Sequence, residues 1–115
     1  MSGAPAPPTQ DSVLASLSSA ADAARQSYMN ALTSTPAGTD LSQLYAKEMA
    51  ALNAWSSAED KALANDPAVA GAQGSLDAAT KAVRNDLSNF KDVATSLTVV
   101  DNLVKLATTL SGFFA

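Results

Sequence analysis

The stretch that decides the fold runs from Leu76 to Phe114 and reads LDAATKAVRNDLSNFKDVATSLTVVDNLVKLATTLSGFF. Its apolar side chains recur every three or four positions, the spacing that lines one face of an α-helix. They are Leu76, Val83, Leu87, Phe90, Ala94, Leu97, Val104, Ala107 and Leu110. One straight helix over this stretch would be about 58 Å long, because an α-helix rises about 1.5 Å per residue.

Two shorter segments upstream, near Asp11–Thr33 and Asp40–Ala64, carry the same periodicity. Each would be about 35 Å long as a helix. The connection between them contains Pro36 and Gly38, which end a helix and permit a turn. The difference in length predicts that the long stretch either bends back or extends beyond its partners with an apolar face exposed.

The boundaries of the later helices follow from local signals. Asn65-Asp66-Pro67 marks a boundary, and two glycines soon after it weaken a helix, so we expect the third helix to begin near Ser75 and continue to about Ser96. Three β-branched residues precede Asp101, so a break near Thr98–Asp101 is compatible with the sequence. The sequence therefore predicts an all-α fold, an antiparallel three-helix bundle whose segment Thr98–Phe114 either forms a fourth helix or extends the third.

Composition supports a helical domain of this size. The chain has 115 residues, and its hydrophobic share of 47% is carried mostly by alanine, leucine and valine. Alanine is the strongest helix former and lets helices approach closely. Residues 1–10 (MSGAPAPPTQ) lack periodicity and are rich in proline, glycine and alanine, so we expect a disordered tail followed by one helical domain over residues 11–115.

Several classes of chemistry lack their usual residues. The chain contains no cysteine and no histidine, which removes thiol nucleophiles, disulfides, and the commonest metal ligand and general base. Glu48 and Glu59 fall near the apolar stripe of the second segment, but they lie about 16 Å apart along a helix, so we interpret them as surface carboxylates. The sequence predicts no catalytic residues, no metal, no cofactor and no small-molecule substrate.

Charge and hydropathy limit the partners. The net charge is −4, and the seven basic residues are scattered singly, which argues against nucleic acid. Asp22 and Arg25 are three residues apart and are expected to form a solvated ion pair. No signal peptide and no apolar run of about 18 residues is visible. The compartment stays open between the cytoplasm and export by a non-classical secretion system.

The C-terminal segment is the candidate interaction element. From Leu103 onward its apolar residues cover more than half of a helix, which indicates burial by the chain itself, another subunit or lipid. The predicted interface residues are Leu103, Leu106, Leu110, Phe113, Phe114 and the sole tryptophan, Trp55. For Trp55, packing in the core or against a turn is the other interpretation. We therefore expect a non-enzymatic structural or interaction protein that forms a homo-oligomer or binds a helical partner. The alternative is a membrane-active protein whose C-terminal segment associates with a bilayer, which the scarcity of basic residues does not favour.

Three short stretches carry a resemblance to a known family. Ala31-Leu32 followed by Pro36, Leu52-Asn53-Ala54-Trp55-Ser56, and Phe90-Lys91-Asp92-Val93 resemble motifs of type III secretion needle subunits, which are short helical hairpins. Trp55-Ser56-Ser57 is also similar to the motif of the WXG family of exported hairpins, with Ser57 at the glycine position. The resemblance implies an exported structural subunit that polymerises through its helices.

Overall fold

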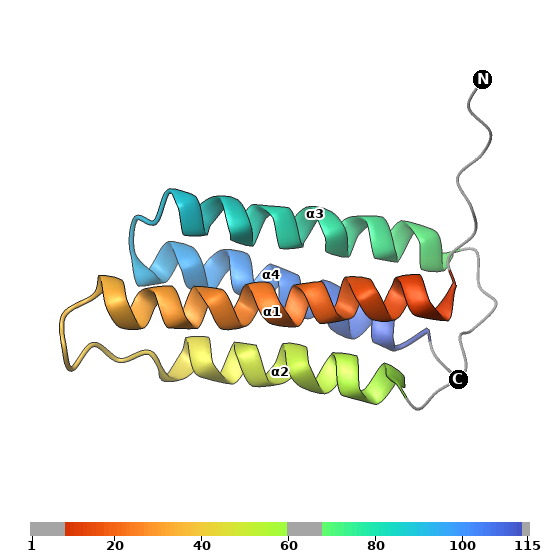
Figure 1. Ribbon diagram of the computed structural model, residues 1–115, viewed down its shortest axis with the longest axis horizontal. Coiled ribbons are helices and arrows are strands. Elements are labelled where there is room, and N and C mark those ends of the chain that lie inside the picture. The colour runs from red at the N-terminus through yellow and green to blue at the C-terminus, as the bar shows by residue number, and fades with distance from the viewer. Residues whose placement is uncertain (1–8, 60–67, 114–115) are drawn as a thin grey trace, which may run out of the picture.

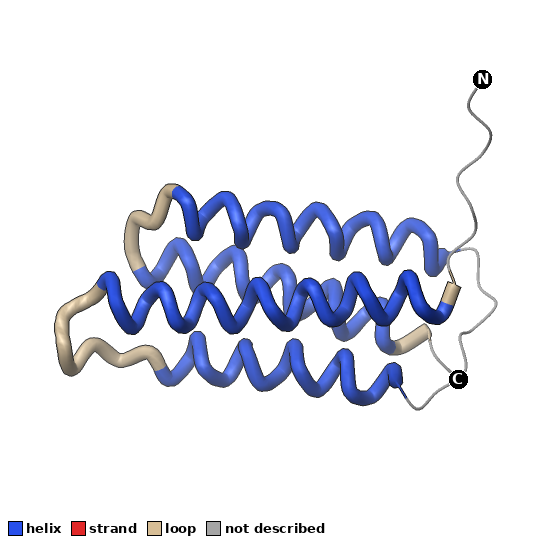
Figure 2. Tube along the Cα trace, viewed as in Figure 1, coloured by secondary structure: helices blue, strands red, loops and turns tan. Residues whose placement is uncertain are grey.

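The residues that the structure describes form four α-helices, in the order α1 (Gln10–Ser34), α2 (Ser42–Glu59), α3 (Ala68–Ser88) and α4 (Val93–Ser111) (Figure 1). The structure is a computed structural model, and it describes residues 9–59 and 68–113. The described residues contain helices and turns but no strand, which confirms the all-α prediction (Figure 2). Of the two arrangements left open for the C-terminal segment, the structure has the separate fourth helix, which folds back against the other three, so the described bundle has four helices and not three.

The first helix begins slightly earlier than Asp11. Thr9 is its N-cap: the Thr9 hydroxyl accepts a hydrogen bond from the Ser12 amide at 3.1 Å, and the Thr9 amide donates to the Ser12 hydroxyl at 2.9 Å. This reciprocal capping satisfies two backbone groups that the first turn would otherwise leave unpaired. The predicted disordered tail therefore does not include Thr9 and Gln10, and residues 1–8 lie outside the described part of the chain.

The turn between α1 and α2 is built as the sequence predicts. Thr35 is extended, and Gly38 adopts a φ of +89°, a conformation that side chains other than glycine rarely adopt. Asp40 then accepts a hydrogen bond from the Ser42 amide at 3.0 Å at the start of α2. The expected end of the second helix near residue 64 lies outside the described residues.

The third helix begins at Ala68 and not near Ser75. Both glycines that were expected to weaken its start lie inside it, on its exposed side. Tertiary contacts compensate for them, because Val69 is 3% exposed and Gln73 donates a hydrogen bond to the Ser16 hydroxyl of α1 at 3.1 Å. The boundary at residues 65–67 lies outside the described part of the chain.

The break in the long C-terminal stretch falls at residues 89–92, so the expected continuation of the third helix to Ser96 is wrong. Asp92 is extended and is the N-cap of α4, because its carboxylate accepts a hydrogen bond from the Thr95 amide at 2.7 Å. Thr98–Asp101, where a break was compatible with the sequence, lies inside α4. A good cap at Asp92 therefore outweighs the weaker signal of the β-branched residues.

The bundle has α1 and α4 at its centre. Each of them packs against the other three helices, whereas α2 and α3 lie on opposite edges (Figure 1). The core is rich in alanine on α1, which lets the helices approach closely, and in larger aliphatic residues on α3 and α4. The largest fully buried apolar side chains are Leu17, Leu44, Leu76, Leu103, Leu110, Val13, Val83 and Val100.

Candidate functional site

The structure separates the residues that were predicted to form the interface. Leu103 and Leu110 are 0% exposed and belong to the intramolecular core. Leu106 and Phe113 are half-buried against that core, and Phe114 lies outside the described residues. In this fold the chain itself covers most of the apolar circumference of α4, because α4 contacts α1, α2 and α3.

The exposed apolar surface lies instead on α1 and α2. Among the described residues, four large apolar side chains are exposed: Met29 at 50%, Leu32 at 46%, Tyr45 at 50% and Met49 at 40%. Residues three or four apart on a helix share one side, so Met29 and Leu32 lie on one side of α1, and Tyr45 and Met49 lie on one side of α2. The two helices are antiparallel neighbours, and the rings of Tyr28 and Tyr45 pack with their centroids 5.4 Å apart. We call these four exposed side chains the apolar patch.

A shallow groove of about 170 Å³ continues the apolar patch along the same two helices. Two residues that line the groove share a helical side with the patch: Arg25 is four residues before Met29 on α1, and Leu52 is three residues after Met49 on α2. Residues at these spacings lie on the same side of a helix, so the patch and the groove are continuous along both helices. The groove is lined by Ser18, Ala21, Asp22, Arg25, Leu52 and Trp55. The apolar patch and this groove together form what we call the α1–α2 face.

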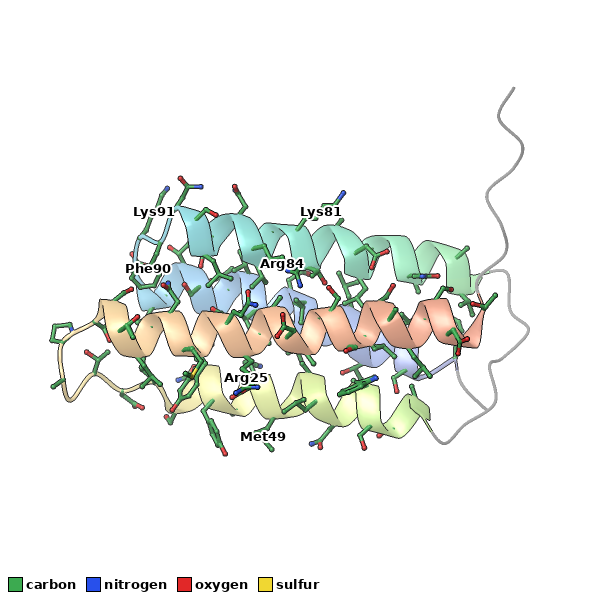
Figure 3. The ribbon with its side chains drawn as sticks, in the orientation of Figure 1. Arg25, Met49, Lys81, Arg84, Phe90 and Lys91 are labelled. Carbon is green, nitrogen blue, oxygen red and sulfur yellow. The ribbon has the colours of Figure 1, made fainter. Side chains whose placement is uncertain are left out.

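The charges on the α1–α2 face are one cation and one anion. Asp22 accepts a hydrogen bond from the Gln26 amide group at 2.9 Å, and its carboxylate lies 3.7 Å from the guanidinium of Arg84 on α3. The expected Asp22–Arg25 ion pair is therefore wrong. Arg25 forms no ion pair or hydrogen bond with any described residue. In Figure 3 its side chain lies over the junction of α1 and α2, and Met49 projects from the outer side of α2.

A second group of charges joins α2 to α4. The Lys47 ammonium lies 2.6 Å from one oxygen of Asp101, and the Lys105 ammonium lies 3.1 Å from the other. The hydrogen bond from Lys47, followed by that from Lys105, lowers the pKa of the Asp101 carboxyl below its usual value. The two ammonium groups share one carboxylate, so this contact joins α2 to α4 and keeps a net charge of +1.

The interpretation of Glu48 as a surface carboxylate is wrong, because this residue is only 8% exposed. It lies four residues after Leu44 and three before Ala51, both about fully buried, so it shares the side of α2 that faces the core. Glu59 ends α2, and its side chain lies outside the described residues. Within residues 9–59 and 68–113, no group of three or more acidic, histidine or cysteine residues is arranged to hold a metal ion.

The comparisons with known proteins return no relative. No protein-family model, no curated protein and no solved structure matches this chain significantly. Among the described helices, none combines the length and the apolar character that crossing a membrane requires.

Sequence reasoning did not single out the α1–α2 face, although it did single out Trp55. Tyr45 and Met49 follow the same periodicity as the buried Leu44, so an amphipathic pattern assigns all three to the core side of the helix. A usable signal was the presence of one methionine on each of two neighbouring helices, Met29 and Met49, since methionine is frequent on adaptable binding surfaces.

Proposed function

We propose that this protein is a non-enzymatic helical interaction protein that binds another protein surface through the α1–α2 face. The observation that carries the proposal is the clustering of all four exposed large apolar side chains among the described residues on one pair of helices. With fractional exposures near one half, these side chains together expose roughly 350 Å², which is the size of the largest apolar patch on a typical monomer, and such a patch is often functional.

The composition of the face supports this function. Tyrosine, tryptophan and arginine are the residues most often found at the energetic centres of protein interfaces, and Tyr45, Trp55 and Arg25 lie on this face. Methionine side chains adapt to the shape of a partner because they are unbranched and polarisable. The surrounding bundle holds these groups on two helices whose core sides are packed, so binding would require little rearrangement of the backbone.

The resemblance to secretion needle subunits supports a structural-subunit role, and Trp55 in one of the matching stretches also lines the groove. An interface through α4, as the sequence predicts, would present Leu106 and Phe113, since Leu103 and Leu110 are covered within the bundle. The membrane-active alternative requires α4 to leave the bundle and expose these core residues. Flotation with vesicles tests it, because a bundle that keeps α4 packed stays with the soluble fraction.

Site-specific cross-linking in the native cells tests the proposed function. A photoreactive phenylalanine derivative replaces Tyr45 on the α1–α2 face, and in a matched control it replaces Lys81 on α3, which projects from the opposite edge of the bundle (Figure 3). We expect a discrete cross-linked protein from position 45 and none from position 81. Equal cross-linking from both positions, or none from position 45, would contradict the proposal.

A further inference from the structure

We propose that the α1–α2 face binds a second copy of this chain, with the two faces packed about a twofold axis that crosses the helices at right angles. This inference rests on the proposed function and names its partner. In such a dimer α1 lies antiparallel to α1 of the second copy, and α2 lies antiparallel to α2 of the second copy. A twofold interface requires the same surface to be complementary to itself, and the α1–α2 face meets that requirement in shape and in charge.

The shape complementarity comes from the two unlike ends of the face. The apolar patch, with its projecting side chains, lies toward the turn between α1 and α2, and the groove with its small residues Ser18 and Ala21 lies toward the other end. If the axis passes midway between Asp22 and Arg25, Met29 lies about 8 Å from it on one side and Ser18 about 8 Å on the other. Rotation by half a turn therefore places Met29 of each copy over Ser18 of the other.

The same rotation brings together the aromatic residues of α2. The Tyr28–Tyr45 ring contact sets the antiparallel register of α1 and α2, and in that register Trp55 lies level with Ser18. Tyr45, which is 50% exposed, is then placed over Trp55 of the second copy. An aromatic pair of this kind stabilises an interface beyond the burial of its area.

The charge complementarity is reciprocal. Arg25 has no partner among the described residues, and Asp22 keeps about half of its side chain exposed (54%) while bonded to Gln26 and Arg84. Each lies about 2 Å along the helix from the axis, so Arg25 of one copy meets Asp22 of the other, twice. The face carries one positive and one negative charge, so the repulsion between two copies that each carry a net charge of −4 is not centred on this interface.

The size of the face sets the expected strength. From Ser18 to Leu32 it runs about 21 Å along α1, and two neighbouring helices are about 20 Å across, which gives roughly 400 Å² of projected area per copy. That area is typical of weak, reversible complexes. We expect a concentration-dependent dimer with a dissociation constant between about 1 µM and about 1 mM.

Charge reversal and mixing test the inference. The solution mass is measured by sedimentation equilibrium for the full chain, whose monomer is 11.7 kDa, and for chains carrying Arg25→Glu or Asp22→Arg. Each variant alone places like charges across the axis twice, so each should raise the dissociation constant by about tenfold or more. An equimolar mixture of the two restores two opposite-charge contacts, so a heterodimer should form with an affinity near that of the unmodified chain.

Two controls make the result specific. Lys81→Glu changes the net charge as Arg25→Glu does but lies on α3, away from the face, and should leave the dissociation constant unchanged. Met29→Ser together with Tyr45→Ser removes projecting apolar groups that are already half-exposed, so the fold should persist while the dimer weakens about tenfold or more. Circular dichroism verifies that each variant remains helical.

The inference is overturned if the unmodified chain remains a monomer at about 1 mM, or if the mixed variants do not associate more tightly than either alone. The cross-linking experiment separates this failure from failure of the proposed function. A monomeric chain whose position 45 cross-links to a different protein retains the interaction function and loses the second copy as its partner. A monomeric chain that gives no cross-link at position 45 loses both.

Discussion

Leu103→Ala tests whether α4 belongs to the chain's own core. Leu103 is 0% exposed in the middle of α4, so its truncation removes a full set of apolar contacts and leaves a cavity. Substitutions of this kind destabilise proteins by about 3 kcal/mol. Leu106 is three residues away on the same helix but only half-buried, so Leu106→Ala is the matched control and should destabilise the fold by about 1 kcal/mol.

Urea unfolding measures the difference. For a small domain the free energy of unfolding falls by about 1.5 kcal/mol per molar urea, so the midpoint should fall by about 2 M for Leu103→Ala and by less than about 1 M for Leu106→Ala. Circular dichroism follows the helices, and the fluorescence of Trp55, which is half-buried, follows the α1–α2 face independently. Coincident transitions with an unchanged slope would show that both variants unfold in one step.

One outcome would refute the reasoning. If Leu103→Ala leaves the urea midpoint unchanged and instead lowers the solution mass, Leu103 contacts another chain and not the core of its own. The same result for Leu110→Ala, another fully buried residue of α4, would extend that conclusion to the whole segment that the sequence predicts as the interface. A loss of stability in both variants without a change in mass supports the intramolecular core.

Three further predictions concern single residues. The Ser27 hydroxyl is buried and makes no hydrogen bond within the described part of the chain, so Ser27→Ala should raise the free energy of unfolding by about 1 kcal/mol. Chemical denaturation measures this change, and a lower free energy of unfolding would mean that the hydroxyl has a hydrogen-bond partner. Gly38 has a φ of +89°, so Gly38→Ala should destabilise the fold by roughly 1 kcal/mol. Gly74 is exposed inside α3, so Gly74→Ala should stabilise the fold by roughly 0.5 kcal/mol. A change of the same sign in both variants would refute this argument from backbone conformation. The hydrogen bond from the Thr95 amide lowers the pKa of Asp92 in the folded state. The cap therefore stabilises the fold at pH values above the pKa that Asp92 has in the unfolded chain, and this stabilisation is lost as the pH falls through the lower pKa of the folded state. Asp92→Ala should therefore lower Tm by about 4 °C near neutral pH and by much less at about pH 2, and an equal loss at both would show that the charged cap is not the cause.

The positions of the helices were largely predictable, because they depend on local spacing. Periodicity located α1 and α2 to within a few residues at each described end, and the Pro36–Gly38 turn has the conformation that its residues favour. The two errors in α3 and α4 have a common cause. Local propensity predicted that the glycines would delay the start of α3 and that the β-branched residues at 98–100 could interrupt a helix. The packing of Val69 and the cap formed by Asp92 instead decided the boundaries of α3 and α4.

The candidate site was less predictable, because it depends on which apolar residues remain uncovered. Leu103 and Tyr45 follow equally regular apolar patterns, but one is fully buried and the other is half-exposed. Glu48 shows the reverse case, a charged residue turned toward the core because its neighbours on the same side are Leu44 and Ala51. Helical spacing fixes which residues share a side, but not which side a neighbouring helix covers.

The sequence by itself determined that this chain is helical, where most of its helices lie, and which residues share each helical side. These properties come from local propensity and spacing, which act within a few residues. Only the tertiary structure decided that residues 93–111 fold back as a fourth helix, that α4 is covered on several sides, and that the uncovered apolar surface lies on α1 and α2. The physical reason is that burial depends on how each helix is rotated toward its neighbours, and those neighbours are distant in the chain.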